Sequence, residues 1–76
     1  MFFGMSSEQE YLDLGIPKEW VPVLIELGYD TVEKLGEVEK FTKLHQEMMG
    51  FRKKNKLDIG TVSPEKVREW IERSRQ

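Results

Sequence analysis

The residues best suited to chemistry in this chain are a cluster of cations that contains one amide. The candidates, which lie within positions 43–56, are Lys43, Arg52, Lys53, Lys54, Asn55 and Lys56. Four formal positive charges within positions 52–56 can release the counterions condensed on a nucleic acid when they neutralise its phosphates. A guanidinium can bind a phosphate through two parallel hydrogen bonds, and an amide can hydrogen-bond a base or a sugar. The cluster therefore predicts an RNA contact, and the alternative is a solvated helix end whose lysines keep the domain in solution.

Catalytic side chains are sparse by comparison. The chain has one histidine, His45, and no cysteine, and a serine–histidine–acid set cannot be located from the sequence. His45 shares a helical register with Phe41 and Met49, so we expect a packed or half-exposed structural histidine. Neither a Gly-x-x-x-x-Gly-Lys phosphate loop nor an alternating Asp/Asn calcium loop occurs. We expect no cofactor and no metal site, and no enzymatic activity from this chain alone.

Length and composition limit the possible architectures. With 76 residues and a mass of 9.0 kDa the chain can form one small domain, which buries only roughly 60% of its unfolded surface. The lack of cysteine excludes disulfides and is typical of a reducing, cytoplasmic setting. No apolar run approaches the roughly 20 residues that span a bilayer, so a membrane is not an expected partner.

The net charge of −2 conceals an uneven distribution along the chain. Positions 8–39 carry nine acids against two lysines, whereas positions 40–56 carry six bases against one acid, Glu47. Such polarity presents a basic patch to an anion, and it also allows the basic segment of one copy to pair with the acidic half of another.

Glycine follows a stretch rich in leucine or methionine three times, at Gly15, Gly28 and Gly50. A glycine just past a helix end can adopt the left-handed conformation, and the apolar residue after it then folds back on the last helical turn. This pattern pairs Tyr11 with Ile16 and Leu24 with Tyr29. Three such stops predict short helices joined by tight turns.

Helix-start signals agree with these stops. Ser7 with Glu10 is a capping box, and Ser63 followed by Pro64 is typical of a helix start. The predicted helices cover 7–14, a single turn at 17–20, 21–27, a short helix capped by Asp30 or Thr31, 40–49, a further turn at 52–56, and a last helix from 63. Residues expected in the core include Trp20, Val32, Leu35, Val38, Leu44, Met48, Val67, Trp70 and Ile71. We predict an all-α fold, a compact orthogonal cluster of about five short helices of the helix-hairpin-helix or SAM-like kind, with 7–75 as a single helical domain. Positions 1–6, which include Phe2 and Phe3, are expected to be a flexible apolar terminus or the cut-away tail of a longer protein.

Four segments carry a family resemblance: 14–24 (LGIPKEWVPVL), 43–47 (KLHQE), 50–57 (GFRKKNKL) and 67–71 (VREWI). They are similar to a C-terminal extension of some bacterial lysyl-tRNA synthetases, and the resemblance covers about 11–73. More loosely, the Leu-Gly turns resemble those of small helix-hairpin-helix-like domains of unknown function. The resemblance to the synthetases implies a module appended to a class II ligase, whose catalytic core would lie elsewhere. It further implies a contribution to tRNA binding, or docking onto the rest of the parent enzyme.

The sequence leaves three functional hypotheses open. The first is a non-catalytic accessory domain that binds RNA, such as tRNA, through the basic segment 43–56. The second is a SAM-like protein-interaction module that self-associates or docks onto its parent enzyme. The third is a structural spacer without a specific ligand.

Overall fold

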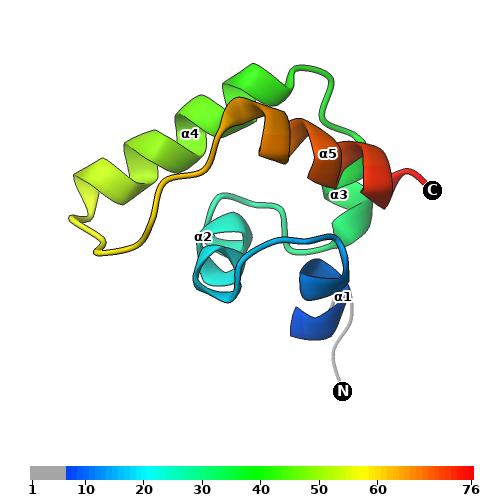
Figure 1. The fold of residues 1–76 in the computed structure, drawn as a ribbon, viewed down its shortest axis with the longest axis horizontal. Coiled ribbons are helices and arrows are strands. Elements are labelled where there is room, and N and C mark those ends of the chain that lie inside the picture. The colour runs from blue at the N-terminus through cyan, green and yellow to red at the C-terminus, as the bar shows by residue number, and fades with distance from the viewer. Residues whose placement is uncertain (1–6) are drawn as a thin grey trace.

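The computed structural model describes residues 7–76, and this part of the chain folds into helices, turns and loops (Figure 1). In chain order the elements are α1 (Glu8–Asp13), the 3-10 turn η1 (Lys18–Trp20), α2 (Val21–Glu26), α3 (Val32–Gly36), α4 (Phe41–Lys54) and α5 (Pro64–Ser74). The predicted all-α class is confirmed. The finer assignment to a helix-hairpin-helix or SAM-like type stays a prediction, and the expectation for positions 1–6 lies outside the described residues.

The predicted helix starts are formed by local side-chain caps. Ser7 and Glu10 make the capping box: the Glu10 N–H donates to Ser7 Oγ at 3.4 Å, and the Ser7 N–H donates to Glu10 Oε2 at 2.7 Å. At α3 the cap is Thr31 rather than Asp30, and Ser63 caps α5. Each cap accepts a hydrogen bond from an N–H that has no partner within the helix.

Two of the predicted glycine stops are present. Gly15 and Gly28 have φ values of +93° and +105°, a region that L-residues with a Cβ rarely occupy. At the first stop the Ile16 N–H donates to the carbonyl of Tyr11 at 3.3 Å, and at the second the Tyr29 N–H donates to the carbonyl of Leu24 at 2.9 Å. The two predicted residue pairs are therefore joined through their backbones.

The third predicted stop, at Gly50, is wrong. α4 continues through Gly50 and ends four residues later, and the left-handed residue after the helix is Lys56, with φ of +53°. The Leu57 N–H closes this end on the carbonyl of Arg52 at 3.0 Å. The longer helix lets Phe51 pack against the core, an apolar contact that a stop at Gly50 would lose. The expected separate turn at 52–56 is thus the last turn of α4 and its cap.

The core is formed by residues from every helix. Its fully buried members are Tyr11, Ile16, Trp20, Val21, Val23, Leu24, Leu35, Leu44, Met48, Val67, Trp70 and Ile71. α5 packs on both α3 and α4, and both tryptophans are buried as predicted. Val32 and Val38, expected to point inward, are half-buried against this core.

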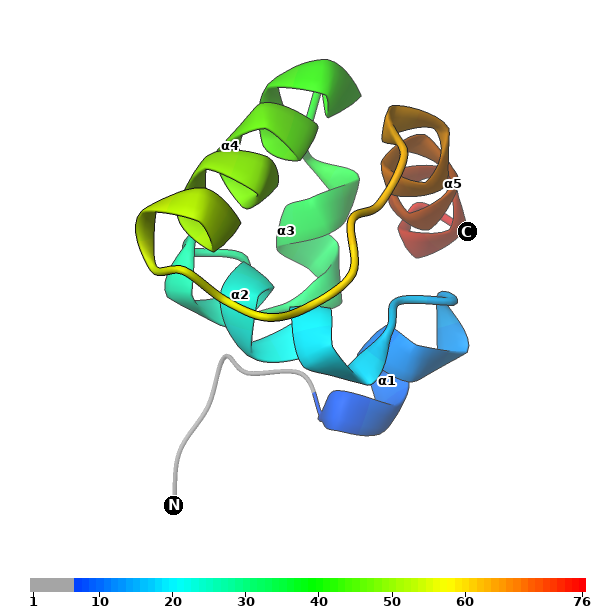
Figure 2. The same cartoon turned by 60° about the vertical axis from the view of Figure 1, so that its left-hand side comes forward.

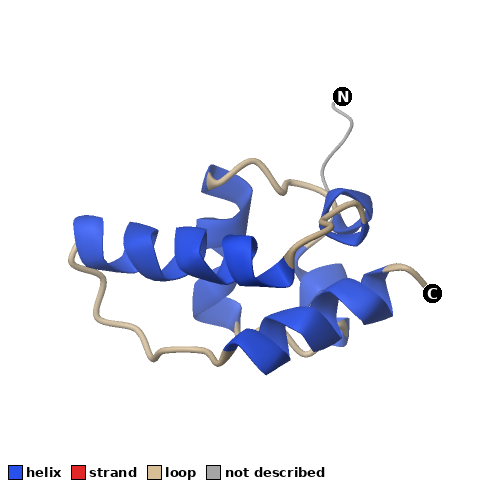
Figure 3. Cartoon of the chain, turned by 90° about the horizontal axis from the view of Figure 1, so that it is seen from above, coloured by secondary structure: helices blue, strands red, loops and turns tan. Residues whose placement is uncertain are grey.

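Residues 57–63, here called the connector, lead from α4 to α5 and run back along α4 (Figures 1 and 3). Three of its carbonyl oxygens lie within hydrogen-bonding distance of side chains from other elements. Trp20 Nε1 donates to Gly60 at 3.0 Å, and Arg52 Nε donates to Ile59 at 2.6 Å. The third contact comes from a ring nitrogen of His45. These contacts hold in place a segment that has no helical hydrogen bonds of its own.

Two arginines tie the end of α5 to earlier helices. Arg73 Nη1 donates to the carbonyl of Leu14, just after α1, at 3.3 Å. Arg75 donates to the carbonyls of Gly36 and Val38, at the end of α3, at 2.7 Å each. Figure 2 shows the end of α5 beside α3 and close to α1.

Candidate nucleic-acid interface

α4 and its C-terminal cap carry all six residues of the predicted cluster. Arg52, Lys53 and Lys54 form its last turn, Asn55 is its C-cap, and Lys56 follows in the left-handed conformation. Lys43 lies eleven residues before Lys54, which is about 16 Å along a helix that rises 1.5 Å per residue. The cluster is therefore spread along one helix and is densest at its C-terminal end.

The structure does not place the six side chains on one exposed stripe. Arg52 is half-buried and turned toward the connector, where its Nε lies 2.6 Å from the carbonyl oxygen of Ile59. The side-chain amide of Asn55 donates to the carbonyl of Phe51 at 3.0 Å and so caps its own helix. These two residues have structural partners that the sequence did not reveal.

The remaining four residues, Lys43, Lys53, Lys54 and Lys56, are exposed. The ion pairs found among residues 7–76 join Lys34 to Asp30 and Arg68 to Glu72, so none of these four lysines is paired there. At 100° per residue, Lys43 and Lys54 lie on the same side of α4, and Lys53 lies on its flank. The charges of Lys53, Lys54 and Lys56 also suit the negative, C-terminal end of the helix dipole.

His45 has the structural role expected of it. Its ring is half-buried, and Nε2 lies 2.6 Å from the carbonyl oxygen of Val62 in the connector. Because a carbonyl oxygen can only accept, Nε2 carries the proton in this arrangement. The histidine therefore helps to hold the connector in place.

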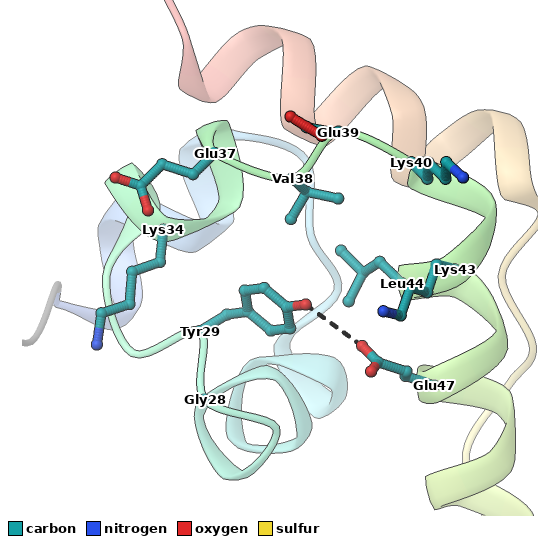
Figure 4. A pocket seen from close by; sticks show the side chains of 10 residues that line it. All are labelled: Gly28, Tyr29, Lys34, Glu37, Val38, Glu39, Lys40, Lys43, Leu44 and Glu47. Atoms are coloured by element: carbon teal, nitrogen blue, oxygen red, sulfur yellow. Dashed lines mark hydrogen bonds between the residues drawn. The ribbon is translucent and has the colours of Figure 1, made fainter.

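A cleft beside α4 was not predicted from the sequence. It has a volume of about 650 Å³ and lies between the segment after α2, α3 and the first half of α4 (Figure 4). Its lining includes Tyr29 together with three lysines and three glutamates, namely Lys34, Lys40, Lys43, Glu37, Glu39 and Glu47. The hydroxyl of Tyr29 donates to Glu47 Oε1 at 3.3 Å, and burial, followed by the nearby Glu47 carboxylate, raises the pKa of Tyr29. The sequence pattern indicated only a helix-cap role for Tyr29, because its partner Glu47 is 18 residues away.

Residues 7–76 also bear on two other classes of site, metal centres and membrane-spanning helices. No group of three or more acidic, histidine or cysteine side chains is arranged to hold a metal ion there. No helix in that range has both the length and the apolar character needed to cross a membrane.

Comparison with known proteins finds similarity to lysine–tRNA ligases. The chain is 39% identical over 66 residues to a lysine–tRNA ligase of Porphyromonas gingivalis, and 38% identical to the lysine–tRNA ligase of a second strain. Each match covers 87% of this chain and 11% of the relative. No family model matches the chain, and no solved structure is significantly similar to it. The resemblance inferred from the four segments is confirmed: over most of its length, the chain is similar to a small segment of bacterial lysine–tRNA ligases.

Proposed function

We propose that this chain is a non-catalytic accessory module of a lysine–tRNA ligase, and that it binds RNA through the C-terminal end of α4. The observation that carries the proposal is that Lys53, Lys54 and Lys56 are exposed at one end of one helix and have no ion pair among residues 7–76. The relatives are named for their action on tRNA, so tRNA is the first RNA to test. A cytoplasmic location belongs to the same proposal.

The electrostatic argument depends on where the acids lie. In α4 the only acid is Glu47, and its carboxylate accepts a hydrogen bond from Tyr29. The nine acids of positions 8–39 precede α4 in the chain, and no ion pair joins one of them to α4 within residues 7–76. The lysines at the basic end of α4 are therefore available to neutralise the phosphates of an RNA backbone, and this neutralisation releases condensed counterions.

The charging reaction itself is assigned to the rest of such an enzyme. The chain matches 11% of each relative's length, and its one histidine already binds the connector. We propose that no residue of this chain takes part in aminoacyl transfer, so the contribution of the module is affinity for RNA.

The test is a titration of fluorescently labelled tRNA with the 76-residue chain at several salt concentrations. The variant Lys53→Gln/Lys54→Gln/Lys56→Gln removes the three exposed cations and leaves the structural Arg52 and Asn55 in place. Each lost phosphate contact lowers the slope of log K against log salt by roughly 0.7 to 0.9, so we expect a slope smaller by about 2 and clearly weaker binding at low salt.

A matched control removes the same charge from elsewhere. The variant Lys18→Gln/Lys66→Gln/Arg68→Gln changes three exposed cations outside α4 and should retain most of the affinity. Equal weakening in both variants would mean that only net charge matters. Absence of tRNA binding by the unmodified chain at low salt would overturn the proposal.

A second candidate function is docking onto the parent enzyme or onto another copy of the chain. The observation in its favour is the unbalanced acidity of positions 8–39, where the one ion pair found joins Asp30 to Lys34. Charge complementarity of this kind steers protein association. Sedimentation at rising protein concentration tests self-association, which should weaken with salt, and a strict monomer would exclude it.

A further inference from the structure

The cleft beside α4 has an aromatic floor that is held in a fixed position. Three hydrogen bonds hold Tyr29: its N–H donates to the carbonyl of Leu24 at 2.9 Å, its own carbonyl accepts from the hydroxyl of Tyr11 at 2.8 Å, and its hydroxyl donates to Glu47 at 3.3 Å. The ring lies between α3 and α4, with Val38 and Leu44 beside it (Figure 4). A side chain already held in this way loses little conformational entropy when a ligand binds on it.

The cations around this cleft differ in their availability. Lys34 is engaged with Asp30 at 2.6 Å. Lys40 and Lys43 line the cleft from the start of α4, are exposed, and have no ion pair among residues 7–76. The volume of about 650 Å³ falls within the range of roughly 300 to 1,000 Å³ that is typical of small-molecule sites. The cleft is large enough for one nucleotide.

We propose that the cleft accepts one nucleotide of a single-stranded RNA segment, with its base against the Tyr29 ring and its phosphate beside Lys40 and Lys43. This inference depends on the proposed RNA-binding function. It adds where one nucleotide binds, in the cleft, and that the bound RNA is single-stranded. A base inside a duplex is stacked on its neighbours, whereas a single-stranded base can stack on an aromatic side chain. Glu47 contributes an acceptor, because Oε2 is not used in its bond to Tyr29, and most bases carry an amino donor.

The placement also joins the cleft to the basic end of the helix. Lys43, at the cleft, and Lys54, in the last turn, lie on the same side of α4 because eleven residues are close to three helical turns. A strand that leaves the cleft along this side passes directly to the lysines already assigned to phosphate binding. This side of α4 therefore links a stacking position at the cleft to the cationic end of the helix, with Glu47 and Gly50 between them, and single-strand sites combine the same two elements.

Two substitutions at one position test the stacking. Tyr29→Phe keeps the ring and removes the hydroxyl, whereas Tyr29→Leu keeps apolar volume and removes the ring. In titrations of a short single-stranded oligoadenylate, we expect Tyr29→Phe to bind within about twofold of the unmodified chain and Tyr29→Leu about tenfold more weakly. Replacement of one adenine by 2-aminopurine gives a direct signal: its fluorescence should be quenched by the unmodified chain and by Tyr29→Phe, and not by Tyr29→Leu.

The outcomes separate this inference from the function on which it depends. If Tyr29→Leu binds like the unmodified chain while Lys53→Gln/Lys54→Gln/Lys56→Gln is weakened, the cleft is excluded and the proposed function stands. If the unmodified chain binds no RNA at low salt, both fail. If circular dichroism shows that Tyr29→Leu is unfolded, the double variant Lys40→Gln/Lys43→Gln, at two exposed positions, replaces it as the test. An oligoadenylate affinity of this double variant equal to that of the unmodified chain would overturn the inference.

Discussion

Arg75 donates its Nε–H to the carbonyl oxygen of Gly36, a residue 39 positions earlier in the chain, at 2.7 Å. Its Nη2 donates to Val38 at the same distance. Gly36 is the last residue of α3, and the final carbonyls of a helix lack partners within that helix. The arginine at the C-cap of α5 therefore caps the end of α3.

Replacement of this arginine should reveal the strength of the cap. We expect Arg75→Lys to lower the free energy of unfolding by about 1 kcal/mol, because lysine keeps the charge but lacks the planar fork that reaches two carbonyls. Urea denaturation measures the change. Arg68→Lys is the control: Arg68 and Glu72 form an ion pair whose side chains are 61% and 56% exposed, and such pairs contribute roughly 0 to 1 kcal/mol. Equal stability of Arg75→Lys and the unmodified chain would contradict the capping role.

Two adjacent cations, Arg52 and Lys53, should respond very differently to the same substitution. Arg52→Gln removes the donor to Ile59, and we expect a loss of about 1–2 kcal/mol in the free energy of unfolding with faster amide exchange in the connector. Lys53→Gln changes an exposed residue and should stay within about 0.5 kcal/mol. Hydrogen exchange measured by mass spectrometry on both variants tests the contrast, and unchanged exchange in Arg52→Gln would show that the connector is held by other contacts.

Gly50 and Gly28 form a matched pair for alanine substitution. In both cases an added Cβ would meet no atom within 4 Å, but Gly50 lies inside α4 whereas Gly28 has φ of +105°. Gly50→Ala should stabilise the protein by about 0.5–1 kcal/mol, because alanine loses less backbone entropy in a helix. Gly28→Ala should destabilise it by about 1 kcal/mol or more, because the left-handed conformation is strained for alanine. Thermal unfolding of the two variants should shift in opposite directions, and shifts of the same sign would contradict the backbone argument.

Alkaline pH should weaken the fold through Tyr11. Burial, followed by the nearby Asp30 carboxylate, raises the pKa of Tyr11 from 10.0 to about 12. The folded state therefore binds the phenol proton more tightly than the unfolded state. The resulting contribution of Tyr11 to the free energy of unfolding is fully present below pH 10 and is lost as pH rises toward 12. Each pKa unit corresponds to about 1.4 kcal/mol, so the loss is on the order of 2–3 kcal/mol.

Tyr11→Phe isolates this effect from other titrations at high pH. The variant lacks the hydroxyl that donates to the carbonyl of Tyr29 at 2.8 Å and should be less stable than the unmodified chain at pH 8. Urea denaturation at pH 8 and pH 11.5 should show the difference between the two proteins shrinking at the higher pH. A difference that is independent of pH would contradict the assignment to Tyr11.

The helix starts and two of the three glycine stops could be predicted because they depend on residues three to five positions apart. Ser7 with Glu10 and Ser63 with Pro64 carry complete local signals. Gly50 follows a similar apolar stretch but lies inside a helix, since the choice between stopping and continuing is decided by what Phe51 packs against. That contact is tertiary and leaves no mark on local spacing.

The candidate site was predictable at the level of the helix that carries it. Sequence composition places the cations on one segment, but Arg52 and Lys53 have the same charge and stand side by side, so nothing local separates the one that holds the connector from the one that is exposed. The cleft could not be predicted from the sequence for a similar reason. It depends on Tyr29 meeting Glu47, and this meeting requires the complete arrangement of α2, α3 and α4.

Two arginines at the C-terminal end of α5 also make contacts across long stretches of the chain. Arg73 reaches Leu14 across 59 residues, and Arg75 reaches Gly36 across 39. During translation, α1 and α3 emerge from the ribosome long before the guanidiniums that complete their C-terminal ends. These two helix ends therefore cannot gain their arginine hydrogen bonds before α5 has docked.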